Sequence, residues 1–574
     1  MKDFFQIRKN LKNDFSNLTS IKIAVLGDSS TQFLAQCIRG LGYDYGLDLQ
    51  ILDADFNQIE QQVFDVNSEI YQYNPDLILV FLSSHKLLVN YNKSKEQDQI
   101  GLASTALNRI DAIYTAIQNQ SNAKVIFYNY TEIDDSVFGS FSTKIESSFL
   151  FQLRKLNFEL MLLAQKNPNL YLCDLSSIQN QIGKSNLFHA PVYISSEMVV
   201  GINVLPIIAE KTIAIINALN GKFKKCVILD LDNTLWGGII GDDGIENIQI
   251  GNLGIGKAFS EFQYWIKKLK NRGVILAVCS KNTESIAKEP FIKHPDMVLK
   301  LDDISVFVAN WDNKVDNIRY IQNVLNIGFD SMVFLDDNPF ERAIVKENLP
   351  DIVVPDLPKD PTEYLEYLYN LNLFETVTFS DVDKDRTKLY QIEAERKLEK
   401  QSFTNEEDFL KNLSMFSVIE SFNSFNIPRV AQLSQRSNQF NLRTIRYSEN
   451  DIEVIASSEK HFTFTFTLED KFGDNGLIAV VILEIKDATK LFIDSWFMSC
   501  RVLKRGMEDF ILNNLVNFAK LKGFDTLIGE YIATPKNQLV QDHYEKLGFA
   551  KKADFWELDV ESYAFKTTYV ATKD

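Results

Sequence analysis

Short apolar stretches alternate with helical patterns over the first region of the chain. The stretches of strand length and composition are "IKIAVLG", "DLILVFLSS", "AKVIFYNY" and "NLYLCDLSS". The segments between them carry the apolar spacing of amphipathic helices, which predicts βαβ units on a parallel sheet. A long apolar helix, "SSEMVVGINVLPIIAEKTIAIINAL", is predicted to close this region, because Asn220 and Gly221 then break the pattern.

A second alternating region begins at "KKCVILDLDNTL". Its predicted strands are "CVILDLD", "GVILAVCS" and "SMVFLDD", and the amphipathic helix "AFSEFQYWIKKLKNRG" lies between the first two. A charged helical connector, "DKDRTKLYQIEAERKLEKQSF", follows the third strand. We place the end of the second region near Thr378.

The last region has a different pattern. The stretch "KHFTFTFTLEDKFG" alternates between apolar and polar residues with a period of two, which is typical of a half-exposed strand in an antiparallel sheet. An α+β fold is therefore predicted there. Because domains usually have about 150 residues, we expect an α/β protein of three domains, over residues 1–220, 221–378 and 379–574.

The net charge of the chain limits which classes of macromolecule or surface it can bind. Lys and Arg number 60 against 77 Asp and Glu, and the resulting charge of −17 repels nucleic acid and anionic membranes at long range. The 42 Phe and 21 Tyr lack the basic neighbours that a stacking surface for nucleic acid needs. We therefore expect neither a nucleic acid nor a membrane as partner.

Cysteine usage and the first residues bear on the cellular compartment. The five cysteines are scattered and never form a CxxC pair, so neither a disulfide framework nor a cysteine zinc site is indicated. The start, "MKDFFQIRKNLKNDF", lacks the apolar core of a signal peptide, and no apolar run reaches bilayer-spanning length. These features predict a soluble, cytoplasmic protein.

Paired carboxylates stand at the ends of two predicted strands. Asp230 and Asp232 follow "VIL", and Asp336 and Asp337 follow "VFL". Ligands of parallel sheets bind beyond the carboxyl ends of the strands, where side chains leave the core. Carboxylates this close repel each other unless a cation lies between them, and Mg²⁺ takes hard oxygen ligands. We predict a Mg²⁺ site at these four residues.

Two further polar residues belong to the same region. Ser280 ends the predicted strand "AVCS", where its hydroxyl would bind a phosphoryl oxygen, and Lys314 in "NWDNK" would neutralise developing charge. A single DxDxT motif is a weak signal, since an Asp-capped turn gives the same letters. Four motifs in order, each at the end of an apolar strand, favour a catalytic site for phosphoryl transfer.

The ordered set "DLDNT", "CSKN", "NWDNK" and "FLDDN" resembles the haloacid dehalogenase (HAD) superfamily of phosphotransferases. The resemblance implies a Rossmann-like α/β fold in which Asp230 is the nucleophile that forms an aspartyl phosphate. It implies that Asp232 is the general acid and base, and that Ser280 and Lys314 position the phosphoryl group.

The same resemblance implies how the metal is held. Asp336, with Asp337 beside it, would bind Mg²⁺ together with Asp230 and the backbone carbonyl of Asp232. All four residues are therefore metal-binding candidates.

The intervals between the motifs leave no room for a separate cap domain. Between Asp232 and Ser280 there is space for one helix and a short loop, and between Ser280 and Lys314 for little more. A capless site is open, so water must be excluded by a neighbouring domain or by the substrate itself. This favours a bulky or protein-borne substrate.

A longer set of motifs extends the resemblance over essentially the whole chain. They are "DLDNTLWGGIIGDDG", "LDDNPFERAIV", "QRSNQFNLRT", "DKFGDNG" and "SCRVLKRGMEDFIL", and they are similar to the FkbH-like family, in the HAD-IIIC class of phosphatases. The resemblance implies removal of phosphate from a phosphorylated three-carbon acid and transfer of its glyceryl unit to the phosphopantetheine thiol of an acyl carrier protein. It also covers family members known only as phosphatases.

The C-terminal region resembles the GNAT acyltransferase fold. "FIDSWFMSCRVLKRGMEDFIL" predicts a strand, a turn and a helix, and a Tyr precedes the ending "LGF". The resemblance implies that the turn with Arg501, Lys504, Arg505 and Gly506 cradles the pyrophosphate of coenzyme A or phosphopantetheine. Lys504 stands where the usual pattern has its first glycine, so it either adds charge to the cradle or obstructs it.

Cys500 lies directly before this turn. Its thiolate would carry an acyl group as a thioester if Arg501, Lys504 and Arg505 favour it, and the alternative is a buried structural cysteine. The same basic residues would attract an acidic carrier protein, or they are ordinary solvated charges of a turn. Both pairs of alternatives stay open on the sequence.

The first region resembles the SGNH hydrolase fold, through "IAVLGDSS" followed by a helix. The resemblance implies Ser29 as nucleophile and His189 as its partner. Asn186 stands where that family has an Asp, and "FLSSH" replaces its GxND motif. We therefore expect a degenerate site in which Ser29 caps a helix, in a domain that positions a partner or covers the phosphatase site.

Two enzymatic functions remain open on the sequence. The first is Mg²⁺-dependent removal of phosphate from a phosphorylated small molecule, coupled to loading of an acyl carrier protein. The second is a plain phosphatase that acts on a sugar phosphate or another metabolite, with the flanking regions for recognition. A non-enzymatic scaffold is disfavoured because the motif residues are intact. The substrate depends on loops whose arrangement the sequence does not give.

Overall fold

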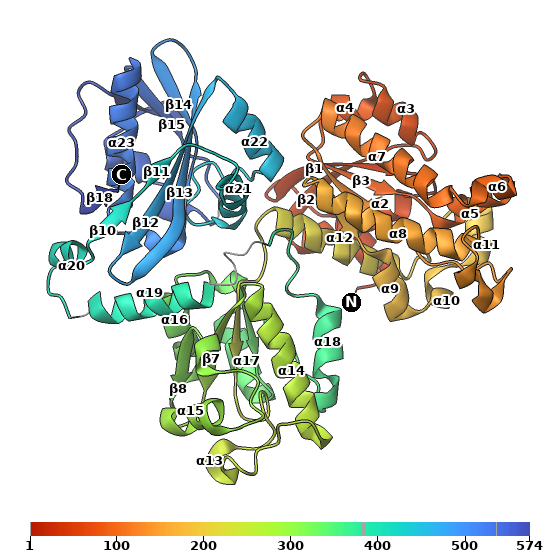
Figure 1. Cartoon of the computed structure of the whole chain (residues 1–574), viewed down its shortest axis with the longest axis horizontal. Coiled ribbons are helices and arrows are strands. Elements are labelled where there is room, and N and C mark those ends of the chain that lie inside the picture. The colour runs from red at the N-terminus through yellow and green to blue at the C-terminus, as the bar shows by residue number, and fades with distance from the viewer. Residues whose placement is uncertain (1, 380–385, 401, 535, 574) are drawn as a thin grey trace. The chain divides into compact units, whose positions relative to one another are not determined.

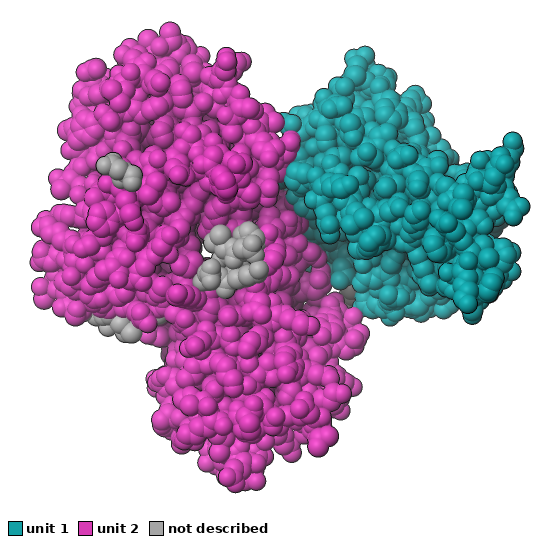
Figure 2. Space-filling view, in the orientation of Figure 1, with its two compact units in different colours: residues 1–217 teal, residues 218–574 magenta. Residues whose placement is uncertain are grey.

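The computed structural model describes residues 2–379, 386–400, 402–534 and 536–573. The chain forms two compact units, Met1–Asn217 and Ala218–Asp574, which Figure 2 colours separately. Unit 2 contains two separate sheets, one on each side of Thr378 in the sequence (Figure 1). The division into three domains stays a prediction. Among the described residues, no helix has both the length and the apolarity to cross a membrane.

Unit 1 contains a five-stranded parallel sheet in the order β2-β1-β3-β4-β5. Its strands are β1 (Thr19–Gly27), β2 (Leu47–Asp53), β3 (Leu77–Phe81), β4 (Lys124–Tyr128) and β5 (Leu170–Cys173). Every residue of β3 is buried, as expected for a central parallel strand covered by helices on both faces. The predicted βαβ alternation is confirmed.

The helices of unit 1 follow and separate these strands. They are α1 (Phe4–Lys9), α2 (Gln32–Asp44), α3 (Ile59–Phe64), α4 (Glu69–Tyr73), α5 (Ser84–Lys93), α6 (Glu96–Gln99), α7 (Leu102–Gln120), α8 (Phe149–Lys166), α9 (Leu175–Ile182), α10 (Lys184–Leu187), α11 (Ala190–Ser196) and α12 (Leu205–Leu219). The predicted long closing helix is too long at its start, because α12 begins only at Leu205. Pro206 fits the first turn of a helix but not its interior, which explains the late start.

The first sheet of unit 2 is parallel and has the order β8-β7-β6-β9. Its strands are β6 (Cys226–Leu229), β7 (Ile275–Ser280), β8 (Val306–Ala309) and β9 (Met332–Leu335). Its helices are α13 (Ile240–Asp243), α14 (Gly254–Asn271), α15 (Glu284–Lys293), α16 (Lys314–Leu325), α17 (Pro339–Asn348) and α18 (Tyr364–Leu371). Three strands and α14 match the prediction, whereas β8 was not predicted.

This sheet is buried on both faces. Val227 of β6 belongs to a core with Phe262 and Ile266 of α14, while its neighbour Ile228 belongs to a core with Ile318 and Ile321 of α16. Successive strand residues point to opposite faces, so both kinds of position must be apolar. The continuous apolar run before Asp230 follows from this arrangement.

The second sheet of unit 2 has nine strands, in the order β16-β17-β15-β14-β13-β12-β10-β18 with β11 beside β12. They are β10 (Met415–Ser417), β11 (Ile419–Glu420), β12 (His461–Asp470), β13 (Gly473–Ile485), β14 (Lys490–Met498), β15 (Thr526–Glu530), β16 (Ala550–Lys552), β17 (Phe555–Asp559) and β18 (Val570–Thr572). β12 and β13 pair antiparallel, as the period-two pattern predicted. β14 and β15 pair in parallel across the helix between them.

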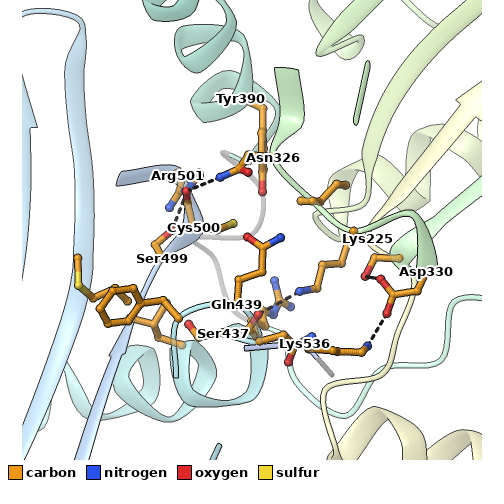
Figure 3. A pocket seen from close by; sticks show the side chains of 18 of the residues that line it. Lys225, Asn326, Asp330, Tyr390, Ser437, Gln439, Ser499, Cys500, Arg501 and Lys536 are labelled. Atoms are coloured by element: carbon orange, nitrogen blue, oxygen red, sulfur yellow. Dashed lines mark hydrogen bonds and ion pairs between the residues drawn. The ribbon is translucent and has the colours of Figure 1, made fainter. Parts of the chain in front are cut away.

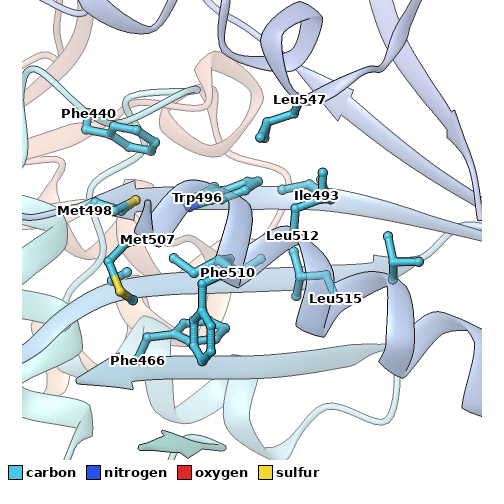
Figure 4. Close-up of a cluster of buried hydrophobic side chains, with 14 of the residues drawn as sticks. Phe440, Phe466, Ile493, Trp496, Met498, Met507, Phe510, Leu512, Leu515 and Leu547 are labelled. Carbon is cyan, nitrogen blue, oxygen red and sulfur yellow. The ribbon is translucent and has the colours of Figure 1, made fainter. Parts of the chain in front are cut away.

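Helices cover this sheet as well. They are α19 (Arg386–Lys400), α20 (Glu406–Asn412), α21 (Ile427–Arg436), α22 (Glu449–Ser457), α23 (Met507–Lys522) and α24 (His543–Leu547). Figure 4 shows Phe510 and Leu512 of α23 packed with Phe466, Trp496 and Met498 of the strands. The strand, turn and helix predicted around Cys500 are therefore present. Residues 383–385 and 401 of the predicted connector helix lie outside the described residues.

Candidate active site

The register of β6 and β9 brings two of the predicted aspartates together. Leu229 pairs with Leu335, the last residue of the neighbouring strand. Asp230 and Asp336 follow directly, so they leave the sheet side by side at its carboxyl edge. The backbone N–H of Asp230 donates to the carbonyl of Leu335 at 3.0 Å. Both aspartates are buried, at 7% and 0% exposure.

Three carboxylates at this edge form a donor set that fits a metal ion. Oxygen atoms of Asp230, Asp336 and Asp337 lie within 4.8 Å of one another. Thr234 accepts a hydrogen bond from the backbone N–H of Asp337 at 3.1 Å, and Asp336 Oδ1 accepts one from the N–H of Asn338 at 2.8 Å. All donors are hard carboxylate oxygens, the chemistry that Mg²⁺ prefers.

The charge balance of this cluster also favours a cation. The Lys314 ammonium lies 3.1 Å from Asp230 Oδ1 and 2.6 Å from Asp336 Oδ2. Burial acts to lower the pKa of Lys314, but the two carboxylates outweigh it and raise that pKa. Burial and the charge of Asp230 raise the pKa of Asp336 to about 7, against the pull of Lys314. Three carboxylates against one ammonium leave negative charge that a divalent cation would balance.

The side chain of Asp232 lies apart from this carboxylate cluster. Its Oδ1 accepts from Trp236 Nε1 and from the backbone N–H of Ile240, both at 3.0 Å, and its Oδ2 accepts from Asn282 Nδ2 at 2.8 Å. Its side chain is not part of the carboxylate cluster, so a contact of Asp232 with the metal would come from its backbone carbonyl, as the resemblance implies. Burial is the main cause that raises the pKa of Asp232, which fits a carboxyl that holds a proton.

Ser280 reaches the same edge from the neighbouring strand. Val278 of β7 pairs with Leu229 of β6, and Ser280 is the last residue of its strand. It is 2% exposed. Lys314 is the first residue of α16, the helix that follows β8. The structure thus brings Asp230, Ser280 and Lys314 to one edge of one sheet.

Three supporting residues were not identified from the sequence. Asn282 holds Asp232, and Thr234 holds Asp337. Arg342 Nη1 donates to the carbonyls of Asp336 at 2.8 Å and Asp337 at 2.6 Å. Each lies inside a motif that the sequence had already marked, namely "SKN", "DNT" and "FERAIV". Their roles depend on contacts between residues of different motifs, and the sequence alone does not show these contacts.

Exposed apolar side chains stand in two segments that connect this sheet to its helices. Between Asp232 and α14 the chain forms a loop with the short helix α13 and two isolated bridges, Asp232 to Trp236 and Gly237 to Gln249. Leu253 and Trp311 are 88% and 73% exposed in the segments after the strand ends. The loops are too short to form a separate lid domain, in line with the predicted open site.

The basic turn after β14 is more buried than its sequence suggested. Arg501 and Arg505 are 8% and 4% exposed, so neither is a solvated charge, whereas Lys504 is exposed. Attraction of a carrier protein by this turn stays a prediction. Arg505 donates to Asp470 at 3.1 Å and to Glu393, within an ion-pair cluster that also contains Arg396. A guanidinium engaged in this way is poorly placed to meet a ligand phosphate.

Lys504 adopts the backbone conformation that a glycine would adopt. Its φ is +64°, and that of Gly506, the N-cap of α23, is +76°. Left-handed φ values cost an L-residue free energy, which explains why the usual pattern has glycine at this position. Lys504 is exposed, so its side chain leaves the turn toward solvent.

Cys500 lines two adjoining cavities in unit 2. One has a volume of 410 Å³ and the other 720 Å³, and Asn326, Phe440 and Arg501 also line both. Cys500 is partly buried, whereas the other four cysteines of the chain are fully buried. Cys500 is therefore not fully buried, and the choice between an acyl-carrying and a structural cysteine stays open. Figure 3 shows Cys500 in the smaller cavity, with Lys225 and Gln439.

Cys500 lies beside the amino edge of the four-stranded sheet, and Asp230 lies at its carboxyl edge. The smaller cavity is lined by Lys225 and Ser331, which precede β6 and β9. Asp230 follows β6, about 16 Å from Lys225 at the usual rise of a strand. None of the predicted phosphatase residues lines either cavity.

The predicted hydrolase pair of unit 1 is not assembled as a pair. Ser29 is fully buried and its Oγ has no hydrogen-bond partner among the described residues. His189 is exposed, and its ring makes no hydrogen bond to Ser29 in the described part of the chain. The predicted capping role of Ser29 is wrong, because Thr31 is the N-cap of α2.

Known proteins resemble this chain in separate regions. Residues 22–217 match the protein family described as "FkbH, N-terminal domain". The N-terminal part of the protein BF1531 from Bacteroides fragilis, which contains a phosphatase domain and was crystallised with Mg, is 53% identical, with a TM-score of 0.64; the match covers 66% of this chain and 100% of that one. No curated protein matches the chain.

Two acetyltransferases match a shorter stretch. The ribosomal-protein-S18-alanine N-acetyltransferase of Escherichia coli is 17% identical over 26% of this chain and 100% of its own, with a TM-score of 0.20. The spermidine N-acetyltransferase of Vibrio cholerae is 11% identical over 25% and 96%, with a TM-score of 0.21. Scores this low carry no conclusion about activity.

The amino-terminal match and the relative aligned over its whole length agree with the motifs at the strand ends. Identity of 53% over the whole crystallised part of BF1531 is far above the level at which only the fold is shared. As the sequence predicted, the chain belongs to the FkbH-like family of the HAD superfamily.

Proposed function

We propose that the chain is a Mg²⁺-dependent phosphatase whose site lies at the carboxyl edge of the β6–β9 sheet. The observation that carries this proposal is the cluster of Asp230, Asp336 and Asp337 around Lys314. The BF1531 relative, crystallised with Mg, supports the choice of ion. When bound, Mg²⁺ would supply positive charge to the phosphoryl oxygens.

The reaction begins with attack on phosphorus. An oxygen of Asp230 forms a bond to the phosphorus atom, the bond from phosphorus to the substrate oxygen breaks, and Asp232 gives its proton to that leaving oxygen. Asn282 and Trp236 hold the Asp232 carboxyl in place through the hydrogen bonds described above. Lys314 and Ser280 orient the phosphoryl group and offset its charge.

The second step regenerates the enzyme. Water attacks the phosphorus of the aspartyl phosphate and gives a proton to Asp232. The bond between phosphorus and the Asp230 oxygen breaks, and inorganic phosphate leaves. Because the mouth of the site is open, the substrate itself must exclude other water.

We further propose that phosphate removal is coupled to transfer of a glyceryl unit to the phosphopantetheine thiol of an acyl carrier protein. The Cys500 thiolate attacks the carbonyl carbon of an acyl phosphate, the carbon–oxygen bond to phosphate breaks, and a thioester forms. The phosphate ester that the acyl unit still carries is hydrolysed at Asp230, which leaves a glyceryl unit. The carrier thiolate then attacks that thioester and releases Cys500. Support comes from the position of Cys500 between two cavities.

Unpartnered polar atoms in the larger cavity support a ligand there. Among the described residues, neither Arg396 Nε nor His543 Nε2 has a hydrogen-bond partner, and both residues line that cavity. Buried polar groups are nearly always paired, so such atoms point to a missing ligand. Phosphopantetheine or coenzyme A would enter beside Gly506, the N-cap of α23.

A plain phosphatase that acts on a sugar phosphate or another metabolite is the second candidate. The separation of Cys500 from Asp230 along β6 favours it, because no single small substrate touches both residues. In this case the flanking regions recognise the substrate, and Cys500 carries no acyl group.

Intact-protein mass spectrometry distinguishes the candidates. The protein is incubated with Mg²⁺ and 1,3-bisphosphoglycerate, beside the variants Asp230→Asn and Cys500→Ala. A mass gain of glyceryl size that is lost in Cys500→Ala and moves to an added carrier protein supports the coupled reaction. Phosphate release without any adduct leaves the plain phosphatase. Full phosphate release by Asp230→Asn rejects both.

A further inference from the structure

The smaller cavity beside Cys500 has a strongly cationic wall. Its volume is 410 Å³, and two acidic side chains, Asp330 and Asp351, face six cationic ones around it. The cationic residues are Lys225, Arg386, Arg429, Arg436, Arg501 and Lys536. This excess occurs in a chain with a net charge of −17, so it is a local feature and not an average one. We call this space the Lys225 cavity.

Two of these cations lack a counterion. Lys536 pairs with Asp330 at 2.5 Å, which removes one acidic group from the balance. The Lys225 ammonium donates to the carbonyl of Arg436, at 3.0 Å, and lies over the ring of Phe223, but it forms no ion pair with a carboxylate in the described ranges. Arg501 likewise pairs with none of the described carboxylates, although it is 8% exposed. Lys225 is half-buried and Arg501 is buried, and a cation removed from water without a counterion is costly.

Unsatisfied polar atoms surround the same space. Arg501 Nη1, Gln439 Oε1 and Ser437 Oγ are buried and have no hydrogen-bond partner in the described part of the chain. All three residues line the Lys225 cavity. Burial of a donor without a partner costs about 1–3 kcal/mol. A ligand that accepts hydrogen bonds and carries negative charge would satisfy Arg501 Nη1 and Ser437 Oγ, whereas Gln439 Oε1 accepts and needs a hydroxyl donor, such as that of hydrogen phosphate.

The electrostatic state of Lys225 agrees with a missing anion. Burial is the main cause that lowers its pKa to about 7; Cys500 acts in the opposite direction, and the charges of Arg386, Lys536 and Arg446 lower the pKa further. An anion in the cavity would favour the protonated amine. We therefore expect the Lys225 amine to take up a proton when a ligand of negative charge enters the cavity.

We propose that the Lys225 cavity binds a phosphate group, free or carried by a small organic molecule, with Lys225 and Arg501 as its charged ligands. A dianion matches two uncompensated cations better than a monocarboxylate does. Arginine offers a planar fork that suits phosphate oxygens, and lysine adds a point charge. The cavity lies at the amino edge of the β6–β9 sheet, so this site is separate from the proposed phosphatase site and does not rest on it.

Alkylation of Cys500 gives a local readout of such binding. Cys500 lines the Lys225 cavity and is the least buried cysteine of the chain. The full chain is treated with iodoacetamide in EDTA, with inorganic phosphate or with chloride at the same ionic strength, and the rate at Cys500 is followed by peptide mass spectrometry. Iodoacetamide is neutral, so added salt does not change its attraction to the protein. EDTA prevents turnover at the phosphatase site.

We expect phosphate, but not chloride, to slow alkylation of Cys500. In Lys225→Met and in Arg501→Met the phosphate concentration for half-protection should rise about tenfold or more, as loss of a hydrogen bond to a charged group implies. The matched control is Lys222→Met, since Lys222 is partly buried nearby in sequence but does not line the cavity. It should keep the protection of the unmodified chain. Circular dichroism establishes that each variant is folded.

The same experiment separates the two sources of phosphate. Protection by inorganic phosphate at low concentration supports a site for the free ion, and protection by 3-phosphoglycerate at much lower concentration supports an organic phosphate. Equal alkylation rates in phosphate and chloride would overturn the proposal without any variant. So would equal protection in the unmodified chain, Lys225→Met and Arg501→Met. Failure of the glyceryl transfer test would leave this result untouched.

Discussion

The two edges of the β6–β9 sheet carry opposite excesses of charge. At the carboxyl edge three carboxylates meet one buried ammonium, that of Lys314. At the amino edge Lys225 and Arg501 meet no carboxylate among the described residues that forms an ion pair with them. One small sheet thus presents a site for a cation and a site for an anion, about 16 Å apart along the strand.

The difference arises from what surrounds each edge. The carboxyl edge is formed by the sheet's own strand ends and by α16, all from one stretch of sequence. The amino edge is closed by residues from the second sheet of unit 2, including Gln439 and Cys500. A site that the sheet forms by itself is visible in sequence motifs, whereas a site between two sheets is not.

Removal of the proposed nucleophile should have the largest effect. Asp230→Asn should lower kcat for phosphate release by about 10⁴-fold or more, because loss of a covalent nucleophile removes the reaction path. Asp316→Asn is the matched control, since Asp316 is an exposed carboxylate of α16 with a side-chain exposure of 67%. Steady-state phosphate release measures both. Similar rates for Asp230→Asn and the control would contradict the carboxyl-edge site.

Loss of a hydrogen bond that orients a metal ligand should have a smaller effect on activity. Thr234→Val removes the hydroxyl that accepts the backbone N–H of Asp337 and keeps the side-chain shape. The Mg²⁺ concentration for half-maximal activity should rise about tenfold, as for other groups that orient metal ligands. Thr283→Val is the control, because Thr283 makes no capping hydrogen bond at the start of α15. An unchanged Mg²⁺ requirement in Thr234→Val would count against Asp337 as a ligand.

The anion site should depend on pH. With a pKa of about 7, Lys225 is protonated in about 90% of molecules at pH 6 and about 10% at pH 8. Sulfate keeps its charge over this range, so its protection of Cys500 should weaken several-fold from pH 6 to pH 8. The groups that face Lys225 are Cys500, Arg386, Lys536 and Arg446. Lys225→Met should show little of this pH dependence, and an equal dependence in that variant would assign it to another group.

The smallest effect concerns the turn beside the amino-edge cavities. Lys504→Gly removes the cost of a left-handed lysine at φ +64° and should raise the free energy of unfolding by about 1 kcal/mol. Lys520→Gly, within α23, should lower it by about 1 kcal/mol, because glycine is a poor helix former. Urea unfolding measures both. A destabilised Lys504→Gly would mean that the lysine side chain contributes contacts that outweigh the strain.

Much of the carboxyl-edge site was predictable from the sequence. Asp230, Asp336 and Ser280 each follow a run of apolar residues, and parallel strands end at one edge, so their proximity follows from chain pattern alone. Asn282 and Arg342 were missed because their contacts join one motif to another. The strands β2 and β8 were missed for a similar reason, since a strand at the edge of a sheet has a shorter or less apolar pattern.

The amino edge was not predictable in the same way. Arg505 stands in a basic stretch that looks solvated, yet it is buried by Glu393 and Asp470 from distant parts of the chain. Lys225 precedes a strand and has no motif around it. Its environment comes from packing between two sheets, which single-sequence patterns do not encode.

The most direct test of the central claim is a titration of the full chain with Mn²⁺ in place of Mg²⁺, followed by electron paramagnetic resonance. The account predicts one tightly bound Mn²⁺ per chain that is lost in Asp336→Asn and retained in the exposed control Asp316→Asn. Retention of that bound ion in a folded Asp336→Asn variant would contradict a metal site at the carboxyl edge.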